Sequence, residues 1–236
     1  MPARTRTRTH EHIARAVVSE RSAAIEAVPR LLEDWYRQNA RDFRWRRGEL
    51  SPWQLLVAEV CLQQTMSPRV DAFLPGFLSR FPDAAALAAA PRAEVESALR
   101  PLGFQRKRAA VLQGLAEALA GRDIPRTRDA LLALPGVGQY VASAYLCAVH
   151  GEPTFLLDVN FARIVERVFA PRLRPDLRDD PVLETVGRAL AGAAHDPRRF
   201  NWAMLDLGAL VCRPTAPRCD RCPLVVHCAY AAAVEE

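Results

Sequence analysis

Apolar residues recur at every third or fourth position along most of this chain, and short segments containing Pro or Gly interrupt them. This spacing places the apolar side chains on one face of an α-helix. Clear examples are "AIEAVPRLLEDWYRQN", "SPWQLLVAEVCLQQT", "DVNFARIVERVFA" and "DPVLETVGRALAGAA". No segment shows the alternating, β-branched pattern of a half-buried strand. The sequence therefore predicts an all-α protein of about ten short helices.

Two of the expected helices are joined by "LPGVG", residues 134–138. Gly136 and Gly138 suit a tight turn, because glycine tolerates positive φ and close backbone approach. Amides at the start of the next helix would point outward and form a small anion site, for which a nucleic-acid phosphate is a natural ligand. Taken alone, the motif favours an ordinary hairpin turn, and only other signals favour the phosphate site.

Four cysteines gather in a Pro-rich segment with the spacing C-x6-C-x2-C-x5-C: Cys212, Cys219, Cys222 and Cys228. Four thiolates within one short loop can converge on a single metal centre, either an iron–sulfur cluster or a structural zinc ion. Zinc sites usually pair two short C-x2-C-like knuckles, and only one such pair is present here. Disulfides are the weaker interpretation, because no secretory signal is visible.

Two carboxylates stand in apolar surroundings. Glu59 lies in "LLVAEVCLQQ", where loss of solvation should raise its pKa and keep it able to donate or shuttle a proton. Pairing with an arginine is the structural alternative for this residue. Asp158, in "TFLLDVNFARIV", directly precedes an expected helix and suits an N-cap, where it can also present a fixed negative charge. Both residues are therefore candidates for catalysis.

Half of the 236 residues are apolar and a quarter are charged, which is the composition of a globular protein. The net charge of +5 allows a polyanionic partner without requiring one. No apolar run approaches the roughly 20 residues of a membrane span, so we expect a cytoplasmic protein with no membrane partner. Residues 1–20, which include "PARTRTRTHEH", are expected to form a flexible basic arm.

Together these features resemble the helix-hairpin-helix DNA glycosylases that carry an iron–sulfur cluster. "LPGVG" resembles the hairpin of that superfamily, and Asp158 in "LLDVN" falls at its catalytic aspartate position. The cysteine spacing is similar to that of the endonuclease III and adenine glycosylase branches. "VAEVCLQQT" resembles the segment that bears the catalytic glutamate of adenine glycosylases, and "FRWR" and "NWAMLDLGALVC" resemble neighbouring family segments.

The resemblance implies two helical domains that flank a cleft, into which one base is flipped. One domain would be a helical barrel with the helix-hairpin-helix motif, residues 50–155. The other would join residues 21–49 to residues 156–236 and hold the four-cysteine loop. The resemblance also implies a [4Fe-4S] cluster rather than zinc. It further implies a nucleoid-associated monomer that binds double-stranded DNA containing a mispaired or damaged base.

The resemblance implies hydrolysis of the N-glycosidic bond to leave an abasic site. Asp158 would stabilise the oxocarbenium-like sugar, and Glu59 would manage protons on the departing base or on water. Tyr140 would contact the base or the edge of the sugar. The expected DNA contacts are the two candidate wedge residues, Gln64 and Phe104, together with Gln63, Leu134, Gly136, Val137 and Gly138.

The excised base depends on the branch of the superfamily. Endonuclease III has a Schiff-base lysine at the second position after the hairpin. This chain has Tyr140 there, and a tyrosine at that position resembles the mismatch-specific thymine glycosylases. Lys107 is the only lysine in the chain, so strand-cleaving lyase activity should be weak or absent. Gln63 and Gln64 favour the adenine branch, although "GFQRKRA" lacks its paired tyrosines. No C-terminal domain that would read oxidised guanine is visible either.

We therefore expect a monofunctional DNA N-glycosylase that removes thymine or uracil opposite guanine. The first alternative is an adenine glycosylase that acts on A:G or A:8-oxoguanine pairs without the usual C-terminal recognition domain. A second is a non-catalytic DNA-binding protein in which the hairpin and cluster only hold structure. A third is a zinc-stabilised helical module.

Overall fold

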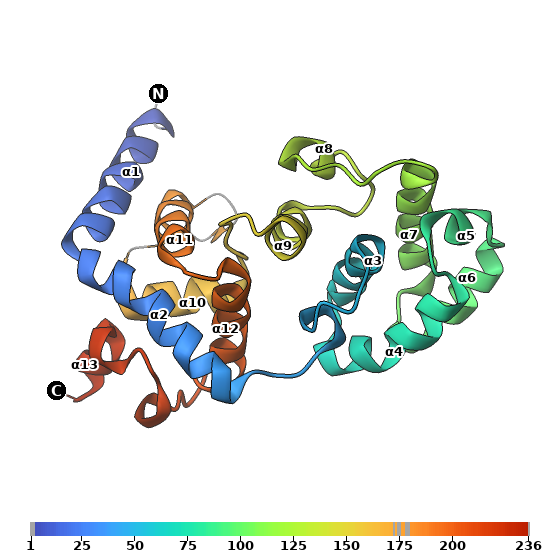
Figure 1. Ribbon diagram of the computed structural model, residues 1–236. Coiled ribbons are helices and arrows are strands. Elements are labelled where there is room, and N and C mark those ends of the chain that lie inside the picture. Colours follow the sequence, from blue (N-terminus) through green and yellow to red (C-terminus); the bar gives the residue numbers. More distant parts are fainter. Residues whose placement is uncertain (1–2, 172, 174–175, 178–179, 236) are drawn as a thin grey trace. The chain divides into compact units, whose positions relative to one another are not determined.

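The computed structural model describes residues 3–171, 173, 176–177 and 180–235 (Figure 1). This part of the chain contains thirteen α-helices and no β-strand, which confirms the predicted all-α class. None of its helices is both long and apolar enough to cross a membrane. The chain divides into two compact units, of which one is Asp42–His150 and the other joins Met1–Arg41 to Gly151–Glu236.

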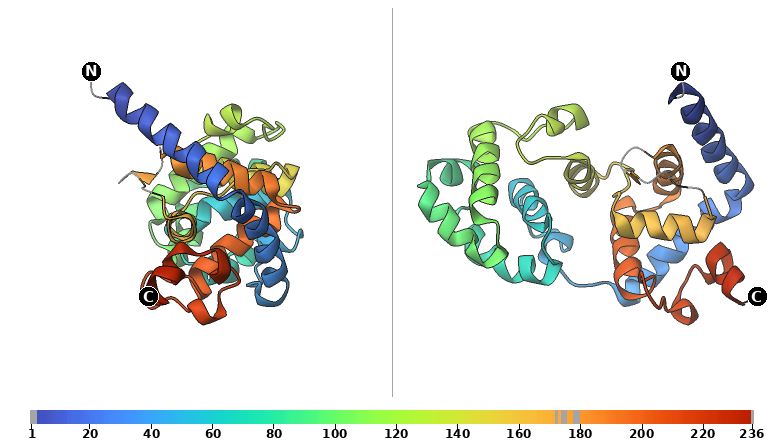
Figure 2. Two further views of the ribbon diagram at one scale, coloured as in Figure 1. Left: turned by 90° about the vertical axis from the view of Figure 1, so that its left-hand side faces the viewer. Right: turned by 180° about the vertical axis from the view of Figure 1, so that it is seen from behind.

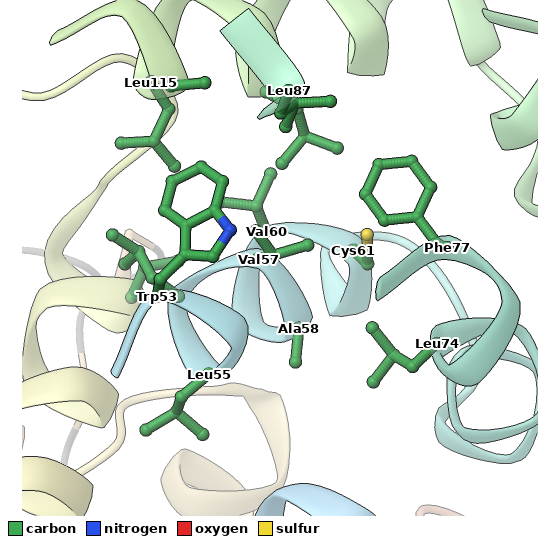
Figure 3. Packing of buried hydrophobic residues seen from close by; sticks show 14 of the residues in the cluster. Trp53, Leu55, Val57, Ala58, Val60, Cys61, Leu74, Phe77, Leu87 and Leu115 are labelled. Carbon is green, nitrogen blue, oxygen red and sulfur yellow. The ribbon is translucent and has the colours of Figure 1, made fainter. Parts of the chain in front are cut away.

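The continuous unit is built around one buried, largely apolar helix, α3. Its helices are η1 (Arg44–Arg46), α3 (Pro52–Leu62), α4 (Ser67–Arg80), α5 (Ala84–Ala89), α6 (Arg92–Leu99), η2 (Arg100–Leu102), α7 (Gln105–Leu119), α8 (Arg128–Leu132) and α9 (Gln139–His150). Ser51 caps α3, and its side chain and that of Gln54 form a reciprocal capping box. Helix α3 packs on α9, α4 and α7. Figure 3 shows Trp53 and Cys61 of α3 among the buried apolar side chains of this core. A helix buried on every side is a central core helix.

The second unit combines helices from both ends of the chain. They are α1 (Ala3–Glu20), α2 (Ser22–Asn39), α10 (Val159–Phe169), α11 (Pro181–Ala193), α12 (Pro197–Leu210), η4 (Cys219–Arg221), η5 (Val225–His227) and α13 (Ala229–Glu235). Helix α1 packs along α11, and α2 packs on α12 (blue against orange in Figure 1). Helix α10 contacts both α12 and α13, and the right-hand view of Figure 2 shows α13 beside it. The apolar face of α10, which includes Phe161 and Val165, is buried in this core.

Two predictions about the domains need correction. Residues 3–20 form helix α1 rather than a flexible arm, and Ala14 on this helix is fully buried against the second unit's core. The unit boundaries fall at 41/42 and 150/151 rather than at 49/50 and 155/156. The reason is packing: Phe43 and Trp45 stack with centroids 4.8 Å apart in the core of the continuous unit. Phe155 packs instead against the core of the second unit.

Candidate active site

Asp158 caps the N-terminus of α10, as the sequence predicts. Its Oδ1 accepts a hydrogen bond of 2.7 Å from the backbone N–H of Phe161. Its Oδ2 accepts a second one of 2.7 Å from the side-chain amide of Asn160. Both carboxylate oxygens are therefore fixed, and the charge sits at the positive end of a helix dipole. The sequence predicted that Asp158 caps the helix but did not reveal that Asn160 holds its second oxygen.

Asn160 is itself held by two further residues. Its Oδ1 accepts a hydrogen bond of 2.7 Å from Arg163, whose Nε donates to the carbonyl of Cys212 at 2.8 Å. Gly208 on α12 makes room for the amide, because a Cβ there would lie 2.5 Å from Asn160 Cβ. A chain of contacts thus runs from the backbone of the first loop cysteine to Asp158. An asparagine two positions after the aspartate and an arginine three further on are the sequence signals for it.

The segment before Asp158 is positioned by α12. Asn201 is buried, its Oδ1 accepts from the backbone N–H of Leu156 at 2.8 Å, and its Nδ2 donates to the carbonyl of Thr154 at 2.8 Å. These bonds replace the sheet or helix partners that an extended buried segment lacks. The "NWAMLDLGALVC" segment therefore fixes the path into α10 from one end and accommodates Asn160 through Gly208 at the other.

Glu59 lies in the C-terminal half of α3 in the continuous unit and is buried among apolar side chains. Burial raises the pKa of this carboxyl to about 7, and the positive charge of Arg46 acts in the opposite sense but less strongly. Its Oε2 finds no hydrogen-bond partner among the described residues. A carboxyl with such a pKa holds or releases its proton close to neutral pH, which suits general acid–base catalysis.

The predicted hairpin joins α8 to α9. Gly136 has φ +77°, and a Cβ there would lie 2.2 Å from Val111 Cγ1 on α7, so both conformation and space require glycine. Gly138 is exposed and open, with no atom within 4 Å of an added Cβ. Val137 is buried, so only its backbone is available to a ligand. Helix α9 begins directly after this turn, at Gln139, and the N-terminus of a helix suits a phosphate.

The two candidate wedge residues lie on separate loops of the same unit. Gln64, which follows α3, is exposed and has φ +57°. Phe104 precedes α7, is 64% exposed and has φ +49°. Gln63 Nε2 donates to the carbonyl of Gly136 at 2.9 Å, which ties the first loop to the hairpin. The Gln63 side chain thus holds the hairpin, a role that the sequence interpretation missed.

Predicted site residues are distributed over both units. Asp158 and the four cysteines belong to the unit formed by both chain ends, and Glu59, Tyr140 and all predicted DNA contacts belong to Asp42–His150. Within the first of these units the structure connects Asp158 to the cysteine loop through Asn160 and Arg163. Within the second it brings Gln63 to the hairpin.

The cysteine loop follows α12 and carries free, half-buried thiols. Burial raises the pKa of Cys222 to about 11, and the neighbouring thiols contribute to that shift. Burial and then the charges of Cys228 and Cys212 raise the pKa of Cys219, so these side chains lie close enough to interact. No three His, Cys, Asp or Glu side chains of the described part surround a single ion position. Four soft thiols in one loop are nevertheless the donor set of an iron–sulfur cluster.

Arg167 lies against this loop from α10. Its Nη1 donates to Cys212 Sγ at 3.3 Å and to the carbonyl of Arg213 at 2.8 Å, and its guanidinium stacks 4.8 Å from the ring centroid of Tyr230. A guanidinium beside a thiol offsets the negative charge that the loop would carry when its thiols are deprotonated. The loop is thereby suited to binding a metal cluster as thiolates.

The all-helical fold, the glycine hairpin and the capped aspartate define a class of DNA repair protein. Residues 57–178 match the family described as "HhH-GPD superfamily base excision DNA repair protein", and the chain belongs to this family. The matched segment takes in Glu59, the hairpin and Asp158.

The chain is similar to relatives from two branches of this family. The chain is 40% identical over 214 residues to a thymine-DNA glycosylase of Aeropyrum pernix, a match that covers 87% of this chain and 95% of the relative. It is 39% identical over 207 residues to an adenine DNA glycosylase of Mycolicibacterium smegmatis, covering 86% and 69%. Its fold also matches the structure of a thermostable thymine-DNA glycosylase with a TM-score of 0.79, over 92% of this chain and 99% of that one. The sequence identity to that structure is 24%, so this last match shows the shared fold.

Proposed function

We propose that this protein is a monofunctional DNA N-glycosylase of base excision repair, which removes thymine or uracil mispaired with guanine and leaves an abasic site. The observation that carries the proposal is the fixed carboxylate of Asp158, at the start of α10 within the matched family segment. Double-stranded DNA is the partner, and the protein acts on it as a monomer. The target base is turned out of the duplex before it is cut.

Cleavage of the N-glycosidic bond leaves positive charge on the sugar. The Asp158 carboxylate stabilises that charge, and two donors hold its oxygens so that little reorganisation is needed during the reaction. Glu59 moves the proton, either to the departing base or from the attacking water, because its pKa of about 7 allows both states near neutral pH. Tyr140, the second residue of α9, contacts the base or the edge of the sugar.

The choice of base rests on Tyr140 and on the relatives. Tyr140 occupies the position at which the resemblance to mismatch thymine glycosylases places a hydroxyl-bearing side chain. Relatives named thymine-DNA and thymine/uracil-DNA glycosylase are 40% and 39% identical to this chain. The second candidate, adenine excision, is favoured by Gln63 and Gln64 and by the 39% identity to the mycobacterial adenine glycosylase.

Single-turnover excision on T:G, U:G, A:G and A:8-oxoguanine duplexes separates the two candidates. We expect T:G and U:G to be cut and both adenine duplexes to persist. Faster cutting of the adenine duplexes would assign the chain to the second candidate. Cutting of none of the four would overturn the proposal.

The role of Asp158 has its own test. Asp158→Asn keeps a capping side chain but removes the charge, so excision should fall by roughly a thousandfold or more while duplex affinity is retained. Asp196→Asn, at the N-cap of α12, is a matched control that should excise at the wild-type rate. A normal single-turnover rate in Asp158→Asn would remove this aspartate from the mechanism.

We also propose that Cys212, Cys219, Cys222 and Cys228 hold a [4Fe-4S] cluster that organises the loop between α12 and α13. Mutual interaction of these thiols, and the contact of Arg167 with Cys212 Sγ, support this assignment. A brown sample with broad visible absorbance and about four irons per chain is expected. A colourless protein that contains stoichiometric zinc would replace the cluster with a zinc site.

A further inference from the structure

Arg108 on α7 is a buried arginine that contacts two loops in the continuous unit. It is 7% exposed, and its side chain donates to five different oxygen atoms. Nε donates to the carbonyl of Gly103 at 3.1 Å, and Nη1 donates to the carbonyls of Cys61 at 2.8 Å and of Val60 at 3.5 Å. Nη2 donates to the carbonyl of Gln63 at 2.8 Å and to Thr65 Oγ1. A guanidinium has five N–H donors, and these acceptors account for all five.

The acceptors fall on either side of the two candidate wedge residues. Gln64 lies between Gln63 and Thr65, both of which bind Nη2. Phe104 directly follows Gly103, which binds Nε. A single planar group therefore fixes the backbone next to both wedges at once.

Both wedge residues adopt a backbone conformation that has to be imposed by their surroundings. Gln64 and Phe104 have φ values of +57° and +49°, in the left-handed region that side chains rarely adopt. Such conformations are strained for residues other than glycine and persist only where neighbouring structure determines them. Contacts from Arg108 to the flanking residues supply that constraint.

The remaining acceptors lie at the end of the central helix. The carbonyls of Val60 and Cys61 belong to the last turn of α3, where carbonyl groups receive no hydrogen bond from within the helix. The positive guanidinium also lies at the negative end of this helix dipole. Gln63, which follows α3, links this end of the helix to the hairpin, because its side chain donates a hydrogen bond to the carbonyl of Gly136. Arg108 thus joins α3, both wedge loops and, through Gln63, the hairpin.

We propose that Arg108 is a positioning residue for lesion recognition: it holds Gln64 and Phe104 in the geometry that fills the space left by a flipped base. This inference rests on the proposed glycosylase function. Its consequence is a selective defect. Removal of Arg108 impairs extrusion of a stacked base, whereas cleavage of a base that is already unstacked depends on other residues.

Two variants test the proposal. Arg108→Lys keeps the charge but offers three donors from one point, so it cannot bind both loops. Thr65→Val removes one acceptor at a half-buried position and leaves the rest of the network in place. Arg122→Lys is the control, because it makes the same substitution at an exposed arginine that follows the other end of α7, away from both loops.

The readout is the ratio of single-turnover rates on a U:G duplex and on uracil in an unpaired bubble of the same sequence. The wild type must cut both substrates, and failure there would overturn the proposed function rather than this inference. We expect Arg108→Lys to lower the duplex-to-bubble ratio by roughly tenfold to a hundredfold and Thr65→Val to lower it less. The fluorescence of 2-aminopurine placed beside the mismatch should show a matching loss of unstacking on binding.

The control sets the scale for these changes. Arg122→Lys should leave the ratio unchanged. An unchanged ratio in both Arg108→Lys and Thr65→Val, whether the two rates stay normal or fall together, would overturn the proposal. If Arg108→Lys does not fold, Thr65→Val alone decides, by the same ratio.

Discussion

Glu59 is a buried carboxyl in an apolar helix, and its burial has a measurable consequence for stability. Burial raises its pKa from 4.5 to about 7 in the folded protein. The folded state therefore keeps this proton over a pH range in which the unfolded chain has lost it. As pH rises from about 4.5 to about 7, the free energy of unfolding should fall by about 3 kcal/mol.

Glu59→Gln removes this titration and keeps the shape of the side chain. Urea unfolding between pH 4 and pH 8 should show the variant gaining stability relative to the wild type across this window, with a constant difference above it. Glu117→Gln, at an exposed position on α7, should follow the wild type at every pH. If the free energies of unfolding of Glu59→Gln and the wild type differed by the same amount at every pH, burial would not raise the pKa of Glu59.

Asn160 is the second residue whose loss has a specific consequence. It donates to Asp158 Oδ2 and accepts from Arg163, so Asn160→Ala frees one carboxylate oxygen while the bond from Phe161 to Oδ1 remains. Excision should slow by roughly tenfold to a hundredfold, because the charge is less well placed, and DNA affinity should hold. Single-turnover rates and binding anisotropy measure the two effects. Asn39→Ala, at an exposed site on α2, is the control, and equal rates in all three proteins would contradict the role.

At the scale of single elements, helix-forming signals predict most of the structure. The capping serine and Pro52 at the start of α3, the aspartate before α10 and the glycine turn before α9 are all read from adjacent residues. The residues that the sequence did not reveal act over long separations. Arg108 binds a segment more than forty positions away, and Arg163 binds Cys212 at a separation of 49. Local periodicity carries no information about such contacts.

The hairpin gives an element-scale prediction, because its two glycines have different requirements. Gly136→Ala places a Cβ against Val111 in a left-handed conformation, so it should lower the free energy of unfolding by about 1–3 kcal/mol. Gly138→Ala meets open space and should change stability by less than about 0.5 kcal/mol.

The same substitution at Gly138 should weaken duplex binding, because it covers the exposed backbone where a phosphate is expected to approach. Thermal unfolding and fluorescence anisotropy with a U:G duplex measure the two properties. A stable Gly136→Ala variant would show that the turn rearranges freely. An unaltered affinity in Gly138→Ala would remove the phosphate contact.

At the scale of the whole chain, one unit depends on residues from both ends of the sequence. The Arg41 backbone N–H and Nε donate to the buried Asp206 carboxylate at 2.8 and 2.6 Å, and the backbone N–H of Asp196 donates to Glu33 at 3.1 Å. The apolar pattern of α2 predicts that it is buried but not which partner buries it, whereas the basic sequence of α1 predicted an arm rather than a packed helix. The expected arm at residues 1–20 was wrong for this reason: the partner of α1 is α11, far along the chain.

The scarcity of lysine is another property of the whole chain, and it bears on the reaction. A Schiff base with the opened sugar needs a neutral amine, which an arginine cannot supply. Lys107 is exposed on α7 and is the only lysine among 236 residues. Borohydride should therefore trap no covalent protein–DNA adduct, even when every target base has been removed.

Lys107→Arg makes this prediction specific. It keeps the positive charge and removes the last side-chain amine, so it should excise at the wild-type rate and remain untrapped. Gel separation of the borohydride-treated reaction, alongside alkaline cleavage that counts the abasic sites, measures trapping against excision. An adduct that forms with the wild type and disappears in Lys107→Arg would identify a lysine nucleophile. Hydrolysis by water, with Asp158 and Glu59 as its two carboxyl groups, would then no longer describe the reaction.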